Sequence, residues 1–250
     1  MTAELERGDI YFFYRPRVNV DEVRSLDDVQ RLFFVLHVDG THRLRDIIVG
    51  TKHLPDPDSH ERVWAFVAQV SDRAEDLRAE LRQRTYETKT RGERRQPPAR
   101  PAGEGRYVIA DHDGHSHLAY VLELPPELGD AQRAMRIERE ASYVVAVRNP
   151  DAPAPPQMGR TGRTGRTPNL PEHLRNRFGG RRFAQLDAPE WLEHEGLELV
   201  IIGATREPGR ELGLELDPQA EEVHDADLFR DLRIRPEDLP LEPLRSGKLR

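Results

Sequence analysis

The sequence predicts an α+β fold, a mostly antiparallel sheet built from hairpin units with a few packed helices. Two observations carry this prediction. Asp39-Gly40 and Asp113-Gly114 each lie between apolar runs rich in β-branched and aromatic residues, which is the strongest local signal for a β-hairpin. Apolar residues at helical spacing occur only in short stretches between such runs.

Most elements expected in the N-terminal part are strands, with two helices among them. A helix is expected after Asp72, because Asp72 can cap it and an apolar stripe runs from Ala74 to Leu81. A second helix is expected over residues 130–140, and residues 88–105, rich in Arg, Pro and Gly, are typical of a loop or a boundary. Strands are expected over residues 9–14, 31–38, 42–50, 63–70, 107–111, 115–124 and 143–147.

Residues 150–170 divide the chain by composition, since they contain five prolines and three consecutive Gly-Arg-Thr triplets. Such a stretch is typical of a linker or an exposed loop. The predicted organisation is an α+β domain over 1–149, holding both hairpin units, and a small C-terminal α/β segment over 171–250 that packs on it. In this segment we expect helices over 171–178, 188–195 (capped by Asp187) and 227–232, and strands over 197–204 and 212–216.

Composition excludes several classes of protein. Hydrophobic residues make up 36% of the chain and charged residues 33%, and the mean hydropathy is −0.75, so we expect a modest core. The chain has no cysteine, which excludes disulfides, thiolate metal sites and cysteine nucleophiles. No signal peptide and no apolar stretch of membrane-spanning length are present, so the expected compartment is the cytoplasm and no membrane partner is expected.

Three histidines surround the second Asp-Gly pair. If Asp113-Gly114 forms a two-residue turn, His112 and His115 are direct cross-strand partners, and alternation adds His117 to the same face. Three imidazoles and a water form a catalytic zinc pattern, so a divalent metal held by His112, His115 and His117 is one hypothesis. A role in phosphate or proton handling is another, and solvated polar residues beside a turn are the third. The opposite face, with Tyr107, Ile109, Leu118 and Tyr120, is expected to meet the core.

The first Asp-Gly pair has a weaker histidine pattern. The same reasoning opposes His37 and His42 across Asp39-Gly40, on a face shared with Phe33, Val35 and Leu44. We expect these two histidines to form a partly buried structural pair.

Two basic tracts stand out in a chain whose net charge is −7. Ten basic and six acidic residues lie between Arg73 and Arg106, and seven basic and one acidic between Arg160 and Arg182. Arginines that could bind RNA or another polyanion occur in both tracts, where Arg also offers bidentate phosphate contacts: Arg91, Arg94, Arg95, Arg160, Arg163 and Arg166. The alternative is genomic bias, because a GC-rich genome favours Arg codons and only three of the 38 basic residues are Lys.

No complete catalytic motif is present, because the chain lacks GxxxxGK[ST], GxGxxG and GxSxG. Three functions therefore stay open. The first is a cytoplasmic binding or accessory protein whose Arg-rich tracts contact RNA or another polyanion. The second is a metal-assisted hydrolase that uses the three-histidine hairpin face. The third is a purely structural protein or one that bridges partners. The sequence leaves open whether the protein is an enzyme, and assigns no catalytic residue and no cofactor beyond this divalent metal.

Overall fold

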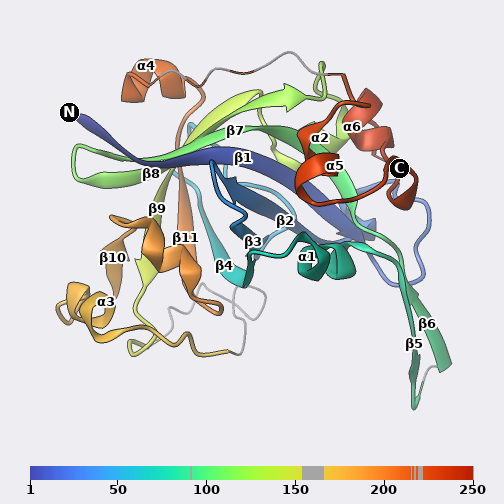
Figure 1. Cartoon of the computed structure of the whole chain (residues 1–250), viewed down its shortest axis with the longest axis horizontal. Coiled ribbons are helices and arrows are strands. Elements are labelled where there is room, and N and C mark those ends of the chain that lie inside the picture. The colour runs from blue at the N-terminus through green and yellow to red at the C-terminus, as the bar shows by residue number, and fades with distance from the viewer. Residues whose placement is uncertain (91, 154–165, 215, 217, 219–221, 250) are drawn as a thin grey trace.

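A closed, eight-stranded antiparallel β-barrel forms the body of the molecule (Figure 1). The computed structural model describes residues 1–250 except 91, 154–165, 215, 217, 219–221 and 250. The strands follow the order β9-β11-β4-β3-β2-β1-β7-β8, and β8 pairs with β9 to close the ring. The barrel strands are β1 Thr2–Pro16, β2 Val29–Val38, β3 Leu44–Val49, β4 Arg62–Ser71, β7 Arg100–His112, β8 His115–Leu124, β9 Glu140–Arg148 and β11 Glu198–Thr205.

The remaining elements are not strands of this barrel. Strand β10 (Phe183–Gln185) pairs with β9, and β5 (Arg84–Thr88) and β6 (Gly92–Gln96) form a separate two-stranded ribbon. Among the described residues, short 3₁₀-helices cover Leu26–Asp28, Pro189–Glu193 and Pro236–Asp238. The α-helices are α1 Ala74–Leu81, α2 Asp130–Met135, α3 Glu172–Arg177, α4 Pro208–Leu212, α5 Asp227–Asp231 and α6 Glu242–Ser246. No helix among the described residues is long and apolar enough to cross a membrane.

The predicted α+β fold class is wrong, because the sheet closes on itself and the helices are short additions to it. Both predicted hairpins exist as β2–β3 and β7–β8. Closure, however, depends on pairings between strands far apart in sequence: β1 with β7, β4 with β11 and β8 with β9. Local turn signals and alternation reveal a hairpin but not the strand that its outer edge will meet.

Side chains fill the interior of the barrel. Ile10, Phe12 and Tyr14 of β1 point inward, and the ring of Phe12 makes an edge contact with Tyr120 at 5.0 Å between centroids. An eight-stranded barrel is just wide enough for side chains to fill it. The predicted core face of the second hairpin is confirmed, since its four named residues belong to this interior cluster: Tyr107, Ile109, Leu118 and Tyr120.

A second apolar cluster covers the outside of β1, β2 and β3. Tyr11 and Phe13 point outward and pack with Leu77 and Leu81 of α1 and with Leu228 of α5. Strand β1 is therefore buried on both faces, which explains why its sequence is an uninterrupted apolar run from Ile10 to Tyr14 rather than an alternating one.

The C-terminal part contributes to the barrel wall. Strand β11 lies between β9 and β4, although the sequence separates it from both by residues 150–170. The division into 1–149, 150–170 and 171–250 stays a prediction, and residues 154–165 of the linker lie outside the described residues. The strand expected over 212–216 is not formed at its start, where α4 ends at Leu212.

Two predicted helix caps are wrong. The residue that caps α1 is Arg73 rather than Asp72, and its side chain makes no capping hydrogen bond. The helix expected after Asp187 is a 3₁₀-helix capped by Ala188, and Asp187 instead accepts a hydrogen bond from Nε1 of the buried Trp191 at 3.0 Å. The Asp187 carboxylate thus provides the hydrogen-bond partner that the indole N–H of a buried tryptophan usually has.

Candidate functional site

Three ionisable side chains meet on the outer face of the barrel. They are Asp9 of β1, His37 of β2 and Asp231 of α5, and one ligand atom from each lies within 4.8 Å of the others. Asp9 and His37 are cross-strand partners in the β1–β2 ladder, which places their side chains on one face. Carboxylate oxygens and an imidazole nitrogen at this spacing could hold a divalent metal ion.

Helix α5 carries Asp231 to this face because two interactions hold the helix on the barrel. The carboxylate of Glu104, only 1% exposed, accepts hydrogen bonds from the backbone N–H groups of Asp227 (2.6 Å) and Leu228 (3.3 Å). A carboxylate at the first turn satisfies N–H groups that have no partner within the helix. Leu228 also packs in the apolar cluster that contains Tyr11.

The hydrogen bonds of His37 define its protonation state. Nδ1 lies 2.8 Å from Asp231 Oδ2 and 3.5 Å from Asp9 Oδ2, and Nε2 lies 3.0 Å from the carbonyl oxygen of Thr41. The hydroxyl of Tyr11 donates to the same Asp231 oxygen at 2.6 Å. Since both ring nitrogens face only acceptors, each must carry a proton to make its hydrogen bond, and the ring is an imidazolium.

The pKa values agree with this assignment. Burial alone would lower the pKa of His37, but hydrogen bonds to Asp231 and Asp9 outweigh it and raise the pKa to about 10. Burial would likewise raise the pKa of Asp231, but hydrogen bonds from His37, Arg230 and Tyr11 hold that pKa well below its usual range. At neutral pH the imidazolium therefore lies between two carboxylates.

Two arginines complete the charge balance of the group. Arg106 pairs with Asp9 and Asp39, and Nε of Arg230 donates to Asp231 Oδ1 at 2.8 Å. A metal ion at this place would have to displace the proton on His37 Nδ1 and compete with both guanidinium groups for the carboxylates. Proton and metal are thus alternative occupants of the same atoms.

A cavity of about 470 Å³ opens beside His37, at the N-terminal end of α1. Its wall includes His42, Arg73, Arg230 and Arg233. The same wall also includes the carboxylates of Asp72 and Glu75, so side chains of both charges border the Asp9–His37–Asp231 group.

His37 lies on the predicted face of its strand, but its predicted cross-strand partner is wrong. His37 pairs with Leu44 across the hairpin rather than with His42, so the connection is longer than a two-residue turn. Its hydrogen-bond partner Asp231 lies 194 positions away in the chain. No local pattern indicates such a contact, because it depends on where α5 packs on the barrel.

The predicted register of the second hairpin is confirmed. His112 pairs with His115, and both turn residues have positive φ, 50° at Asp113 and 80° at Gly114, as a type I′ turn requires. His112 Nδ1 lies 2.7 Å from the Thr2 hydroxyl.

The three hairpin histidines lie on one face of the hairpin, but their ring nitrogens do not converge on one position. Nδ1 of the buried His117 lies 2.9 Å from Ser142 Oγ, and its ring contacts that of His112 edge-on at 5.9 Å. Burial, together with nearby His112 and His115, lowers the pKa of His117 to about 4 and keeps it neutral. Within the described part of the chain these three do not form a group with ligand atoms all within 4.8 Å. Their metal-binding role stays a prediction.

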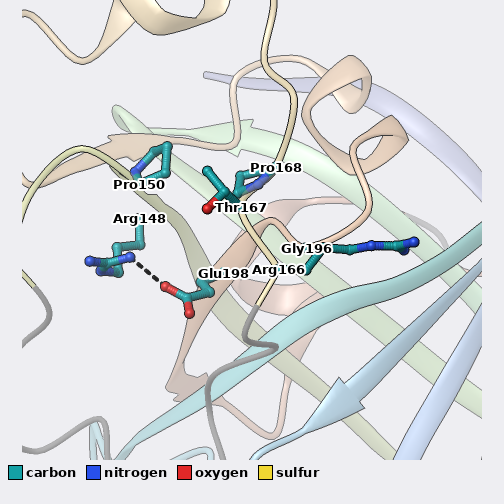
Figure 2. Close-up of a pocket in the computed structure, with 7 residues that line it drawn as sticks. All are labelled: Arg148, Pro150, Arg166, Thr167, Pro168, Gly196 and Glu198. Carbon is teal, nitrogen blue, oxygen red and sulfur yellow. Dashed lines mark hydrogen bonds and ion pairs between the residues drawn. The ribbon is translucent and has the colours of Figure 1, made fainter.

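Three of the six predicted polyanion-binding arginines lie in the described part of the chain. Arg94 and Arg95 lie on β6, and Arg91, Arg160 and Arg163 lie outside the described residues. Arg166 pairs with Glu195 and lines a shallow pocket of about 160 Å³. Figure 2 shows that its side chain extends away from the buried Arg148–Glu198 ion pair on the other side of this pocket.

Comparisons with protein-family models, with curated proteins and with solved structures found no match. A function can therefore be proposed only from the residues and their arrangement.

Proposed function

We propose that this protein is a non-enzymatic accessory protein that binds single-stranded RNA through the β5–β6 ribbon. The observation that carries the proposal is an exposed tyrosine opposite an arginine on a ribbon that extends away from the barrel (Figure 1). Tyr86 of β5 is 44% exposed and is the direct cross-strand partner of Arg94 on β6.

Tyr86 is unusual for this molecule. Among the described residues, the large hydrophobic side chains that are exposed are Tyr86 and the chain start Met1. An aromatic ring in solvent offers a stacking platform for an unpaired base, and a neighbouring guanidinium offers a phosphate contact. Unpaired bases are available in single-stranded RNA, which is why this partner fits better than a duplex.

The arginines of the ribbon have different roles in this proposal. Arg95 is an anchor, because its backbone N–H donates to Asn19 Oδ1 at 2.8 Å and its side chain pairs with Asp21. The side chain of Arg94 forms no hydrogen bond or ion pair with any described residue, so its guanidinium is available to a partner. Lys89 adds an exposed cation near the tip.

Two single substitutions test the ribbon. Tyr86→Ala removes one stacking platform and is expected to weaken binding of an oligouridylate of about 20 nucleotides by roughly 5- to 100-fold, the equivalent of one base stack. Arg94→Gln is expected to lower the slope of log Kd against log salt by about 0.7, one phosphate contact on a single strand. Fluorescence anisotropy at several salt concentrations measures both effects.

The matched control is Arg133→Gln, which removes an arginine that is 70% exposed on α2, outside the ribbon. It is expected to leave affinity and salt slope unchanged. Absence of oligouridylate binding at about 50 mM salt, or equal losses in all three variants, would reject the ribbon as an RNA-binding surface.

Metal-assisted hydrolysis is the second candidate, and the spacing of Asp9, His37 and Asp231 favours it. If it is correct, protein purified without a tag and incubated with zinc or manganese retains about one ion per chain. Retention that is lost in His37→Ala assigns the ion to this group, and retention lost in His117→Ala assigns it to the hairpin histidines. No retained metal in wild-type protein rejects the candidate for both sites.

A further inference from the structure

Asp46 of β3 is a buried carboxyl group without a partner. It is 8% exposed, and no described residue donates a hydrogen bond to either of its oxygens. Oδ1 is also out of reach of solvent. Because burial of an unpaired carboxylate strongly opposes folding, most buried polar groups find partners, and an exception indicates a role other than stability.

The barrel wall is irregular beside Asp46. Asp46 pairs with Gln69 of β4 while Ile47 pairs with Val67, so Ala68 is an additional residue on β4. Such a bulge disturbs the ladder and redirects neighbouring side chains, and bulges often occur next to binding sites. The carboxylate of Glu195 supports the irregular strand by accepting the backbone N–H of Val70 at 3.2 Å.

A cavity of about 380 Å³ lies over this irregularity. Its apolar wall includes Ile48 and Ala68, and its charged wall includes Arg31, Asp46 and Glu80. The size is at the lower end of the range of about 300–1,000 Å³ for small-molecule sites.

Two of the charged groups in the cavity are unmatched. Glu80 pairs with Arg84 at 2.6 Å, and Glu195 pairs with Arg166. Arg31 forms no ion pair with a described residue, and neither does Asp46. These two line the same cavity and are within electrostatic range of each other, but they do not touch.

We propose that this cavity binds a free amino acid or a similar small zwitterion. The ammonium group donates to Oδ2 of Asp46, since only Oδ1 is closed off from solvent. The carboxylate accepts a bidentate pair of hydrogen bonds from Arg31, and the alkyl part lies on Ile48 and Ala68. A guanidinium matches a carboxylate in charge and geometry, and a buried carboxylate is matched by an ammonium donor. A ligand with only one of these charges would leave the opposite wall without a partner.

The charges that face Asp46 make this binding depend on pH. Burial raises the pKa of Asp46 to about 7, Arg31 of β2 and Arg15 of β1 lower it, and Glu80 of α1 raises it. The pKa of Arg15 is itself lowered, to about 10, mainly by burial, so Arg15 stays charged at pH 8. Because an ammonium binds the ionised carboxylate, affinity is expected to rise by roughly tenfold between pH 6 and pH 8.

Isothermal titration calorimetry of the full chain at pH 8 tests the proposal with L-alanine, L-valine and L-leucine. For L-valine two analogues are matched in shape, 3-methylbutanoate without the ammonium and 2-methylpropylammonium without the carboxylate. At least one amino acid is expected to bind, and each analogue is expected to bind more than tenfold more weakly than L-valine if L-valine binds.

Variants separate the two charges. Asp46→Asn and Arg31→Gln are each expected to weaken the binding of the amino acid more than tenfold, Asp46→Asn is expected to abolish the pH dependence, and Arg133→Gln is expected to change nothing. Circular dichroism confirms that each variant is folded. Absence of heat with all three amino acids, equal binding of the analogues, or unchanged binding in Asp46→Asn would overturn the proposal. None of these outcomes bears on the ribbon, which uses other residues.

Discussion

Replacement of Asp46 by asparagine is expected to increase the free energy of unfolding at pH 8 by about 2–3 kcal/mol. The pKa of Asp46 is raised to about 7 by burial, against about 3.9 in an unfolded chain. The folded protein therefore binds this proton more tightly than the unfolded chain. Its stabilising effect is complete below about pH 4 and is lost as the pH rises through about 7.

Urea unfolding at pH 5 and pH 8 measures this effect. The full shift corresponds to about 4 kcal/mol, and the buried amide of the new asparagine offsets part of it. Wild-type protein is expected to lose stability between pH 5 and pH 8, and the variant is expected to lose much less. A variant less stable than wild type at pH 8 would mean that the Asp46 carboxylate has a stabilising partner after all.

Local pattern predicted the hairpins well but not the barrel. The turn at Asp113-Gly114, its register and its core face follow from residues that are neighbours in sequence. Closure requires, for example, that Val200 of β11 lie opposite Trp64 of β4, far earlier in the chain. The residues of apolar strands such as β4 and β11 do not indicate which strand will be their partner.

The ribbon was missed for a different reason. Residues 88–105 were expected to be a loop or a boundary because Arg, Pro and Gly disfavour strands. The structure instead forms β6 and the start of β7 there. The backbone of Arg95 forms two hydrogen bonds with Asn19, each 2.8 Å long: its N–H donates to Asn19 Oδ1 and its carbonyl accepts from the Asn19 N–H. These bonds support β6, although the intrinsic propensities of its residues disfavour a strand. Tertiary contacts override propensity in short strands of this kind.

Both buried charged sites were invisible to pattern analysis. Alternation places Asp46 on the outer face of its strand, where a carboxylate is normally solvated. It is buried, at 8% exposed, on a strand whose neighbouring residues Leu44 and Ile48 pack in the outer apolar cluster with Leu77 of α1. His37 was correctly placed beside Phe33 and Val35, but its partner Asp231 comes from the C-terminal part of the chain.

Replacement of His37 by glutamine is expected to lower the free energy of unfolding by about 2–3 kcal/mol at pH 6 and by little at pH 10. The pKa of His37 is about 10 in the folded protein, against about 6.5 unfolded. The protonated ring therefore stabilises the fold fully below about pH 6.5, and this contribution is lost as the pH rises through about 10. The expected loss is smaller than the full shift implies, because the site borders solvent.

His42→Gln is the matched control, because His42 lines the same cavity without contacting Asp231. It is expected to change stability by less than about 0.5 kcal/mol. Hydrogen exchange over α5 gives an independent measurement, since loss of the His37–Asp231 bond is expected to expose the backbone of Asp227–Asp231.

The direction of the pH dependence also distinguishes a proton from a metal ion as the occupant of the site. The hydrogen bond from protonated His37 to Asp231 weakens as the pH rises, whereas a metal ion binds better once His37 Nδ1 has lost its proton. Stability that increases from pH 6.5 to pH 9 in the presence of zinc, and not in His37→Gln, would therefore identify a metal rather than a proton between Asp9 and Asp231.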